Sequence, residues 1–272
     1  MRNVGLVGAG RMGRAMVHHL IARGFAVSVT DVSAAACEAV AVLGAKVVDT
    51  PAELAARSDA VFIAVGFDEE VSAVCRGADG IFANARPGTI VVVNSTISAD
   101  LVRALGDEAR AKGLDLLDIP IARGAAAAEA GTLLALAGGD AAVLERVRPM
   151  LEAFCSDISH LGDIGHGQVA KAINNLLLWV DGVALTEAGR LAESTGIDLP
   201  GLRDALLMSS GRSWALENWD SVTFTWALKD MQLVLDMCDR TGLSFPMAGL
   251  VKEQVKQARE AKRRGEAKWT GG

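Results

Sequence analysis

The sequence predicts an α/β domain with a doubly wound, mostly parallel sheet, followed by an all-α domain that a long helix joins to it. Three observations predict this fold class. The chain opens with a strand, a glycine-spaced turn and a helix; apolar runs and helices then alternate to about residue 161; and from about residue 168 only helical periodicity remains. We therefore expect domains over residues 1–164 and 165–272.

The opening segment indicates a dinucleotide site. The apolar run at residues 3–7 leads into a complete G-x-G-x-x-G at the start of a helix. Its first glycine allows the tight turn, its second leaves room for a pyrophosphate, and its third lets the helix pack closely on the strand. The unpaired N–H groups of the first helical turn also suit a phosphate. We prefer a Rossmann-type site to a turn without a ligand, and its residues are Gly8, Ala9, Gly10, Arg11, Met12 and Gly13.

The next strand, at residues 26–30, bears on the choice of cofactor. It ends on Asp31, 18 residues beyond Gly13, where a carboxylate can accept hydrogen bonds from both hydroxyls of the adenosine ribose. A 2′-phosphate would face this carboxylate, and Val32 and Ser33 offer no guanidinium to bind it. NAD(H) is therefore expected in preference to NADP(H).

The remaining elements follow in order. We expect helices at 33–43 and after Thr50, an N-cap with proline at the first helical position and Glu53 three residues on. Strands are expected at 46–48, 60–65, 90–93, 116–118, 133–137 and 158–161, and later helices at 167–194, 199–208, 213–219, 224–241 and 246–262. Because ligands lie at the carboxyl ends of such strands, Val65 and the following residues 66–68 are expected beside the cofactor.

Composition narrows the functional class. A chain of 272 residues is long for one core, and its net charge of −6 without a basic block argues against a nucleic-acid partner. No apolar run approaches the roughly 20 residues that span a bilayer, and the first strand leaves no room for a signal peptide. The four cysteines are scattered, which predicts reduced thiols and no metal site. We expect a cytoplasmic protein.

Two loops at strand ends are candidates for a site in the cleft between the domains. The hydroxyls of Ser95 and Thr96 can bond the nicotinamide-side ribose or carboxamide, with a simple helix cap as the alternative. Arg123, between Ala122 and Gly124, has no acid nearby in sequence until Glu129. Its guanidinium suits a carboxylate, sulfonate or phosphonate, and the alternative is an ordinary surface arginine.

Two helical segments complete the candidate site. Lys171, Asn174, Asn175 and Leu178 share one helix face. Desolvation readily lowers the pKa of a lysine, so Lys171 is suited to exchange the proton that a hydride transfer between alcohol and carbonyl requires; an exposed first-turn lysine is the alternative. Lys229 can reach the cofactor, although composition alone favours no role for it, and Asp230 beside it is expected only to cap or pair locally. No Ser/His/Asp triad is apparent.

In combination these motifs resemble the β-hydroxyacid dehydrogenase family, which includes 3-hydroxyisobutyrate dehydrogenase. The matching stretches are G-L-V-G-A-G-R-M-G, S-T-I, D-I-P-I-A-R-G with A-G-T-L-L-A-L-A-G-G, G-H-G-Q-V-A-K-A-I-N-N and L-K-D. The resemblance implies that Thr96 and Lys229 contact NAD, that Lys171 is the catalytic lysine and that Asn175 orients the substrate. It also implies a homodimer or homotetramer joined through the helical domain.

The substrate loop departs from the family pattern D-x-P-V-S-G-G, since Ala122 and Arg123 stand where serine and the first glycine would be. An arginine there resembles the branch with sulfolactaldehyde reductase and 4-hydroxybutyrate dehydrogenase, which implies that Arg123 holds a sulfonate or a distant carboxylate. Leu178 stands where that branch would have a more polar residue. The chain also ends soon after Trp269, where family members commonly continue into one more helix.

The resulting hypothesis is an NAD-dependent oxidoreductase that interconverts a small acidic β- or γ-hydroxy compound and its aldehyde or ketone, with Lys171 as proton relay. Two alternatives are an imine reductase on the same fold, which the lysine disfavours, and a catalytically silent dinucleotide-binding module. The expected substrate contacts are Ser95, Ala122, Arg123, Gly124, Asn174 and Leu178.

Overall fold

The structure, a computed structural model, describes residues 1–270. The chain forms two compact units, Met1–Lys171 and Ala172–Gly272. The boundary falls inside one long helix, so the first turns of that helix belong to the first unit. Within the described residues, no helix is long and apolar enough to cross a membrane.

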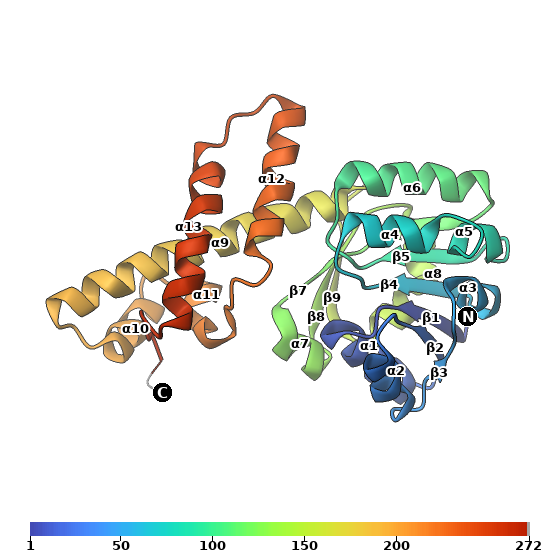
Figure 1. Cartoon of the computed structure of the whole chain (residues 1–272), viewed down its shortest axis with the longest axis horizontal. Helices are drawn as coiled ribbons and strands as arrows, with labels where there is room; N and C mark the ends of the chain where they lie inside the picture. The colour runs from blue at the N-terminus through green and yellow to red at the C-terminus, as the bar shows by residue number, and fades with distance from the viewer. Residues whose placement is uncertain (271–272) are drawn as a thin grey trace. The chain divides into compact units, whose positions relative to one another are not determined.

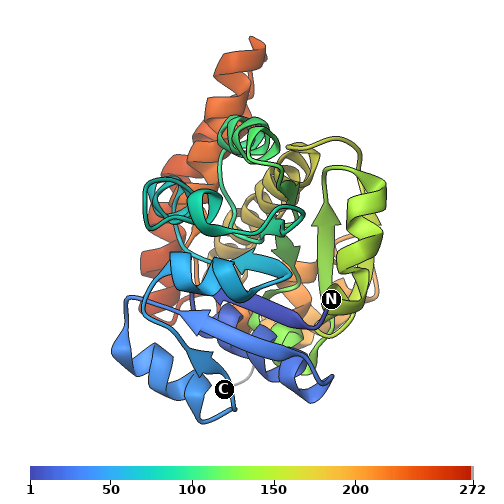
Figure 2. The same ribbon diagram turned by 90° about the vertical axis from the view of Figure 1, so that its right-hand side faces the viewer.

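The first unit is built on a six-stranded sheet in the order β3-β2-β1-β4-β5-β6, and every neighbouring pair is parallel. The order reverses between β1 and β4, which creates the switch point where open α/β sheets bind ligands. The fold class expected from the sequence is confirmed (Figures 1 and 2). The strands are β1 (Asn3–Val7), β2 (Ala26–Thr30), β3 (Lys46–Val47), β4 (Ala60–Ile63), β5 (Ile90–Val93) and β6 (Asp115–Asp118).

Helices cover both faces of this sheet (Figure 1). On β4, Phe62 belongs to one buried cluster while Val61 and Ile63 belong to the other, as the alternation of side chains along a strand requires. One face packs against α1 (Arg11–Ala22), α2 (Ala34–Ala41) and α8 (Ala141–Leu151). The other packs against α3 (Pro51–Arg57), α4 (Asp68–Cys75), α5 (Ile81–Asn84) and α6 (Ala99–Ala111).

The last strands of the first unit form a separate sheet, which the sequence did not indicate. Its order is β7-β8-β9, with β7 antiparallel and β9 parallel to β8. The chain turns after β6, and an antiparallel bridge joins Asp118 to Gly138. A two-residue strand has too few side chains to show a period, so β7 could not be predicted. The elements are β7 (Ile121–Ala122), α7 (Gly124–Ala130), β8 (Leu133–Ala137) and β9 (Cys155–His160).

The described residues of the second unit form helices joined by loops and contain no strand, as expected. Its elements are α9 (His166–Thr195), which starts in the first unit, α10 (Leu199–Leu207), α11 (Trp214–Glu217), a 3₁₀ turn (Trp219–Ser221), α12 (Ala227–Thr241) and α13 (Pro246–Arg263). The helix expected at 213–219 is divided into α11 and the 3₁₀ turn. The helix expected from residue 224 starts at Ala227, because Phe224 has a left-handed φ of 55° that a helix cannot contain.

Large aromatic side chains form the core of the second unit. Trp179, Trp219 and Phe224 pack together, with ring centroids 5.6 Å apart for Trp179 and Phe224 and 6.3 Å apart for Trp219 and Phe224. Near the end of the described chain, Trp269 is fully buried and its indole N–H donates to the carbonyl of Leu185 at 3.1 Å. The final described segment is therefore part of the core of this unit.

The cysteines agree with the expectation of unbridged thiols. Cys75, Cys155 and Cys238 are buried, Cys37 is half-buried, and all four are free. Burial raises the pKa of the Cys75 and Cys155 thiols to about 12.

Candidate cofactor and substrate site

The glycine turn after β1 fits a pyrophosphate. Gly8 has a φ of 97°, and a Cβ on it would lie 2.5 Å from the carbonyl oxygen of Ala64. A Cβ on Gly13 would lie 1.9 Å from the carbonyl oxygen of Gly8, so the approach of α1 requires glycine there. At Gly10, by contrast, an added Cβ would meet no atom of the described residues within 4 Å, which leaves space for a ligand at the start of α1.

Asp31 is held beside this turn at the carboxyl end of β2. Its Oδ2 accepts from the N–H of Ala9 at 2.6 Å and its Oδ1 from the N–H of Ser33 at 2.8 Å. Since a carboxylate offers about four lone-pair sites, it can still accept from ribose hydroxyls. The side chain of Arg11 is exposed and pairs with Glu129 at 3.3 Å, and Met12 packs against the core.

Ser95 links the ends of β4 and β5. Its hydroxyl oxygen accepts from the N–H of Val65 at 2.9 Å, and its O–H donates to the carbonyl of Ile63 at 3.3 Å. Ser95 is buried and Thr96 is half-buried. The Ser95 hydroxyl thus joins the loop that follows β4, which carries Val65, to the loop that follows β5, which carries Thr96. The contact of Ser95 with substrate stays a prediction.

Arg123 adopts an unusual backbone conformation after β7. It has a φ of 85° and precedes Gly124 with a φ of 76°, so two successive residues are left-handed. The Nη1 group of Arg123 donates three hydrogen bonds. Its acceptors are the carboxylate of Asp157 at 2.6 Å, the hydroxyl oxygen of Ser156 at 2.9 Å and the carbonyl of Thr132 at 3.1 Å. The hydrogen bond from Arg123 holds the pKa of Asp157 below its usual range.

This pairing was not visible in the sequence, because Asp157 lies 34 residues from Arg123 and on another strand. The guanidinium uses one nitrogen for all three bonds. Its Nε and Nη2 make no hydrogen bond with the described residues, and its side chain is 39% exposed. That second edge of the guanidinium remains available for a bidentate anion.

Two buried side chains that the sequence analysis gave no role hold the start of α9. The carboxylate of Asp118 accepts from the N–H groups of Gly165 and Gln168, both at 2.8 Å. Burial raises the pKa of Asp118 to about 6, while these two bonds and the nearby His166 act in the opposite direction. The side chain of Gln168 bonds the backbone of the loop after β5.

The signal for Asp118 was present in the sequence, since it is an acid that ends an apolar strand immediately before an Ile-Pro turn. Its partner on α9 could not be identified, because 50 residues separate Asp118 from Gln168. Lys171 follows Gln168 by three residues on α9 and is half-buried.

Farther along α9, the second unit contributes its own predicted residues. Asn175 is buried, Asn174 is exposed, and the Asn174 amide donates to Oδ1 of Asn175 at 3.0 Å. Leu178 packs against the core of this unit. Asn174 therefore lies at the surface and bonds the buried amide of Asn175, whereas Leu178 belongs to the core.

Lys229 lies at the start of α12, with its ammonium 5.6 Å from the ring centroid of Trp226. Next to it, Asp230 is buried and its Oδ2 accepts from the indole N–H of Trp179 at 3.0 Å. The sequence suggests only a local cap or pair for Asp230, but this bond spans 51 residues and joins α12 to α9.

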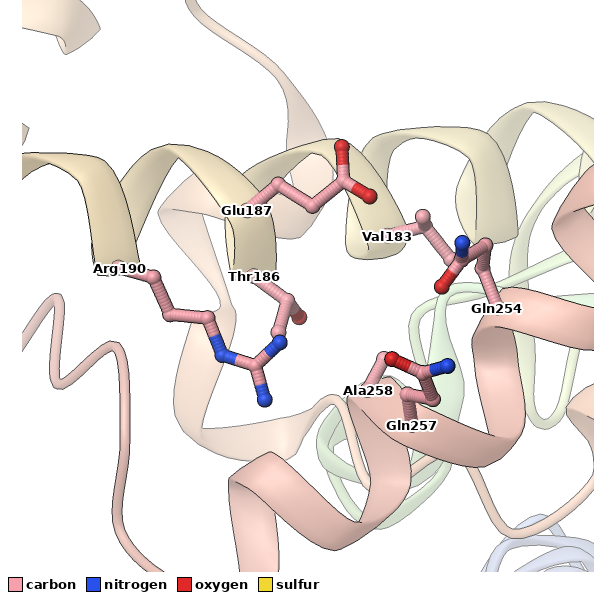
Figure 3. A pocket seen from close by; sticks show the side chains of 7 residues that line it. All are labelled: Val183, Thr186, Glu187, Arg190, Gln254, Gln257 and Ala258. Atoms are coloured by element: carbon pink, nitrogen blue, oxygen red, sulfur yellow. The ribbon is translucent and has the colours of Figure 1, made fainter.

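A cavity of about 90 Å³ lies between α9 and α13 (Figure 3). It is far smaller than the roughly 300–1,000 Å³ of typical ligand sites, and none of its residues was predicted to bind cofactor or substrate. Its lining consists of Val183, Thr186, Glu187, Arg190, Gln254, Gln257 and Ala258.

Comparison with known families matches both parts of the chain. Residues 3–162 match the NAD binding domain of 6-phosphogluconate dehydrogenase. Residues 165–269 match the family described as NAD-binding of NADP-dependent 3-hydroxyisobutyrate dehydrogenase.

Individual proteins agree with these matches. The chain is 36% identical to an NAD-dependent L-serine dehydrogenase of Pseudomonas aeruginosa, over 80% of this chain and 73% of that protein. It is 34% identical to a 3-hydroxyisobutyrate dehydrogenase of the same organism, over 79% of this chain and 72% of the relative. A Mycobacterium tuberculosis 3-hydroxyisobutyrate dehydrogenase solved with L-serine has a TM-score of 0.87 and 30% identity, covering 98% of this chain and 96% of that one.

Proposed function

Since the chain belongs to the β-hydroxyacid dehydrogenase family, we propose that it is an NAD-dependent enzyme that interconverts a small acidic β- or γ-hydroxy compound and its aldehyde or ketone. At the coarser level, it is an oxidoreductase that acts on CH–OH donors with a nicotinamide dinucleotide. The observation that carries the proposal is the position of Lys171, on a helix whose first turn is fixed to the carboxyl ends of β5 and β6.

The cofactor would lie along the carboxyl edge of the sheet. The space at Gly10 and the N–H groups at the start of α1 suit its pyrophosphate, with Ala9, Arg11 and Met12 contributing backbone. Asp31 would accept from the adenosine ribose, and its charge would repel a 2′-phosphate, which favours NAD(H). Other contacts would come from Val65, Thr96 and Lys229. Bound NAD supplies the hydride acceptor and NADH the donor.

Lys171 would handle the proton. During oxidation its amine takes the proton of the substrate hydroxyl as the hydride departs, and during reduction its ammonium returns a proton to the carbonyl oxygen. Asn175 is one helical turn farther on the same helix, so its amide can hold that oxygen in position. Asn174, hydrogen-bonded to Asn175, would orient that amide.

The acid group of the substrate would bind the Nε and Nη2 edge of Arg123, with Ala122 and Gly124 supplying backbone and Leu178 and Ser95 bounding the site. Either a carboxylate or a sulfonate can accept two hydrogen bonds from this edge. The relatives are named for, or solved with, L-serine and 3-hydroxyisobutyrate, both β-hydroxy carboxylates. The resemblance to this family further leads us to propose a homodimer or homotetramer.

The test is NAD reduction by the purified protein with a panel of acids: 3-hydroxyisobutyrate, L-serine, 3-hydroxypropionate, glycerate, 4-hydroxybutyrate and 2,3-dihydroxypropane-1-sulfonate. We expect turnover of at least one compound, and a loss of kcat of about 100-fold or more in Lys171→Ala. Activity that survives in Lys171→Ala would exclude the proton relay.

Two other outcomes would reject the proposal as a whole. Tight NADH binding without turnover of any acid would favour a dinucleotide-binding module. Reduction of a cyclic imine with NADPH, again without turnover of the acids, would favour an imine reductase.

A further inference from the structure

Gln168 spans the loop that follows β5. It is 1% exposed, and its carboxamide makes two hydrogen bonds to backbone groups on either side of Thr96. Oε1 accepts from the N–H of Ile97 at 3.0 Å, and Nε2 donates to the carbonyl of Ser95 at 2.8 Å. A single buried amide thus fixes the residues before and after Thr96.

The helical turn that carries Gln168 is itself fixed. Its main-chain N–H donates to Asp118 at 2.8 Å, as does that of Gly165. A Cβ at position 167 would lie 2.5 Å from the carbonyl oxygens of both Asp118 and Leu136, so Gly167 allows the helix to approach this closely. The start of α9 cannot move along the ends of β5 and β6 without breaking these bonds.

We propose that Gln168 is a positioning residue for the reaction, because it fixes the Thr96 loop relative to the helical turn that leads to Lys171. The inference rests on the proposed function, in which Thr96 contacts the cofactor and Lys171 relays the proton. Gln168 touches neither reactant in this scheme. It acts by fixing the position of the Thr96 loop relative to Lys171. A displacement of about 1 Å between groups at a reaction centre is enough to slow a reaction about 100-fold.

The side chain required here is a neutral one with both a donor and an acceptor. Methionine has a similar length but offers no donor for the Ser95 carbonyl and only a weak acceptor for Ile97. Protonated glutamic acid can make both bonds, since its O–H donates and its C=O accepts. Ionised glutamate loses the donor and places a negative charge against the Ser95 carbonyl. Gln168→Met and Gln168→Glu therefore distinguish the effect of side-chain volume from the effect of the two hydrogen bonds.

The experiment measures hydride transfer in single turnovers of Gln168→Met and Gln168→Glu between pH 5.5 and 8.5, each divided by the wild-type rate at the same pH. We expect Gln168→Met to be slower by about 10- to 100-fold at every pH. Gln168→Glu should approach the wild type at low pH and fall toward Gln168→Met as the carboxyl ionises. A Gln168→Met rate equal to that of the wild type at every pH would overturn the inference. If Gln168→Met does not fold, the same result for Gln168→Ala, which also lacks both hydrogen bonds, would overturn it.

Ser58→Ala is the matched control, because Ser58 is 1% exposed and its hydroxyl donates to the Leu54 carbonyl at 2.7 Å just before β4. It should lower the melting temperature without changing hydride transfer. If the wild type oxidises no acid in the panel, the proposed function fails. The role of Gln168 in fixing the Thr96 loop can then be tested on its own, through the affinity of the protein for NADH. Gln168→Met should then raise the Kd for NADH about 2- to 10-fold, the loss of roughly one hydrogen bond. An unchanged Kd would overturn it.

Discussion

Arg123 donates to Asp157 at 2.6 Å and so links the end of β7 to β9. Arg123 holds its side chain there from a left-handed backbone position with a φ of 85°, which a residue with a Cβ adopts only at a cost. An exposed ion pair contributes about 0–1 kcal/mol to stability, and the hydrogen bonds of the same nitrogen to Ser156 and Thr132 add to it. These contacts oppose a backbone cost of about 1–2 kcal/mol, so the net contribution of Arg123 to the free energy of unfolding is small.

Arg123→Gly should therefore separate stability from binding. Glycine accepts the left-handed φ, so the free energy of unfolding should stay within about 1 kcal/mol of the wild type. The KM for the acid substrate should rise about 10- to 100-fold, the value of a charge-assisted hydrogen bond. Urea unfolding and steady-state kinetics measure the two effects. Arg110→Ala, which removes the exposed pair with Asp107 on α6, is the control and should change neither. A KM unchanged in Arg123→Gly would exclude Arg123 as the anion-binding residue.

Asp118 predicts a pH dependence of stability. Its pKa is raised by burial to about 6 from an ordinary value of 3.8, so between these values the folded chain binds more protons than the unfolded chain. The contribution of this group to stability therefore falls as pH rises from about 4 to 6. The stability of the wild type relative to Asp118→Asn, followed by urea unfolding, should decrease by up to about 3 kcal/mol across this range. A difference that stays constant or increases would contradict the raised pKa.

Gly10 should tolerate alanine in the fold but not in binding. Because no atom of residues 1–270 lies within 4 Å of the added methyl, the free energy of unfolding of Gly10→Ala should lie within about 0.5 kcal/mol of the wild-type value. It should weaken NADH binding about 10-fold or more, since the methyl occupies the space assigned to the pyrophosphate. Fluorescence titration with NADH measures the affinity. Gly249→Ala on α13 also adds a methyl in open space and should leave NADH binding unchanged. Equal affinity in Gly10→Ala would place the pyrophosphate elsewhere.

The Trp179–Asp230 hydrogen bond should couple α9 to α12 energetically. Asp230→Leu leaves the buried indole N–H of Trp179 without this acceptor, which should destabilise the protein by about 1–3 kcal/mol. Trp179→Phe removes the donor, so Asp230→Leu should cost less in that background. A double-mutant cycle by urea unfolding should give a coupling of about 0.5–3 kcal/mol. Strict additivity would show that the bond contributes nothing.

Local signals predicted the elements well where they depend on near neighbours. Thr50 caps α3 as expected, with its hydroxyl accepting from the N–H of Glu53 at 3.1 Å. The helical unit was evident from periodicity alone. The start of α12 was placed three residues early, because the strained φ of Phe224 is fixed by packing with Trp179 and Trp219 rather than by its sequence neighbours. The separate β7-β8-β9 sheet was missed for a similar reason, since strand partners are chosen over long distances in the chain.

The sequence by itself determined the glycine turn, the acid at Asp31, the two-part organisation and the family, because each follows from short motifs, their order and the local periodicity of apolar residues. Only the tertiary structure decided which side chains hold those parts in place. Asp157 pairs with Arg123, 34 residues away in the sequence. Asp118 and Gln168 hold the start of α9 through hydrogen bonds that span 50 and 73 residues. Spacing along a chain encodes the steric demands of a turn or a helix, whereas a buried polar side chain selects its partner only after the strands and helices have packed.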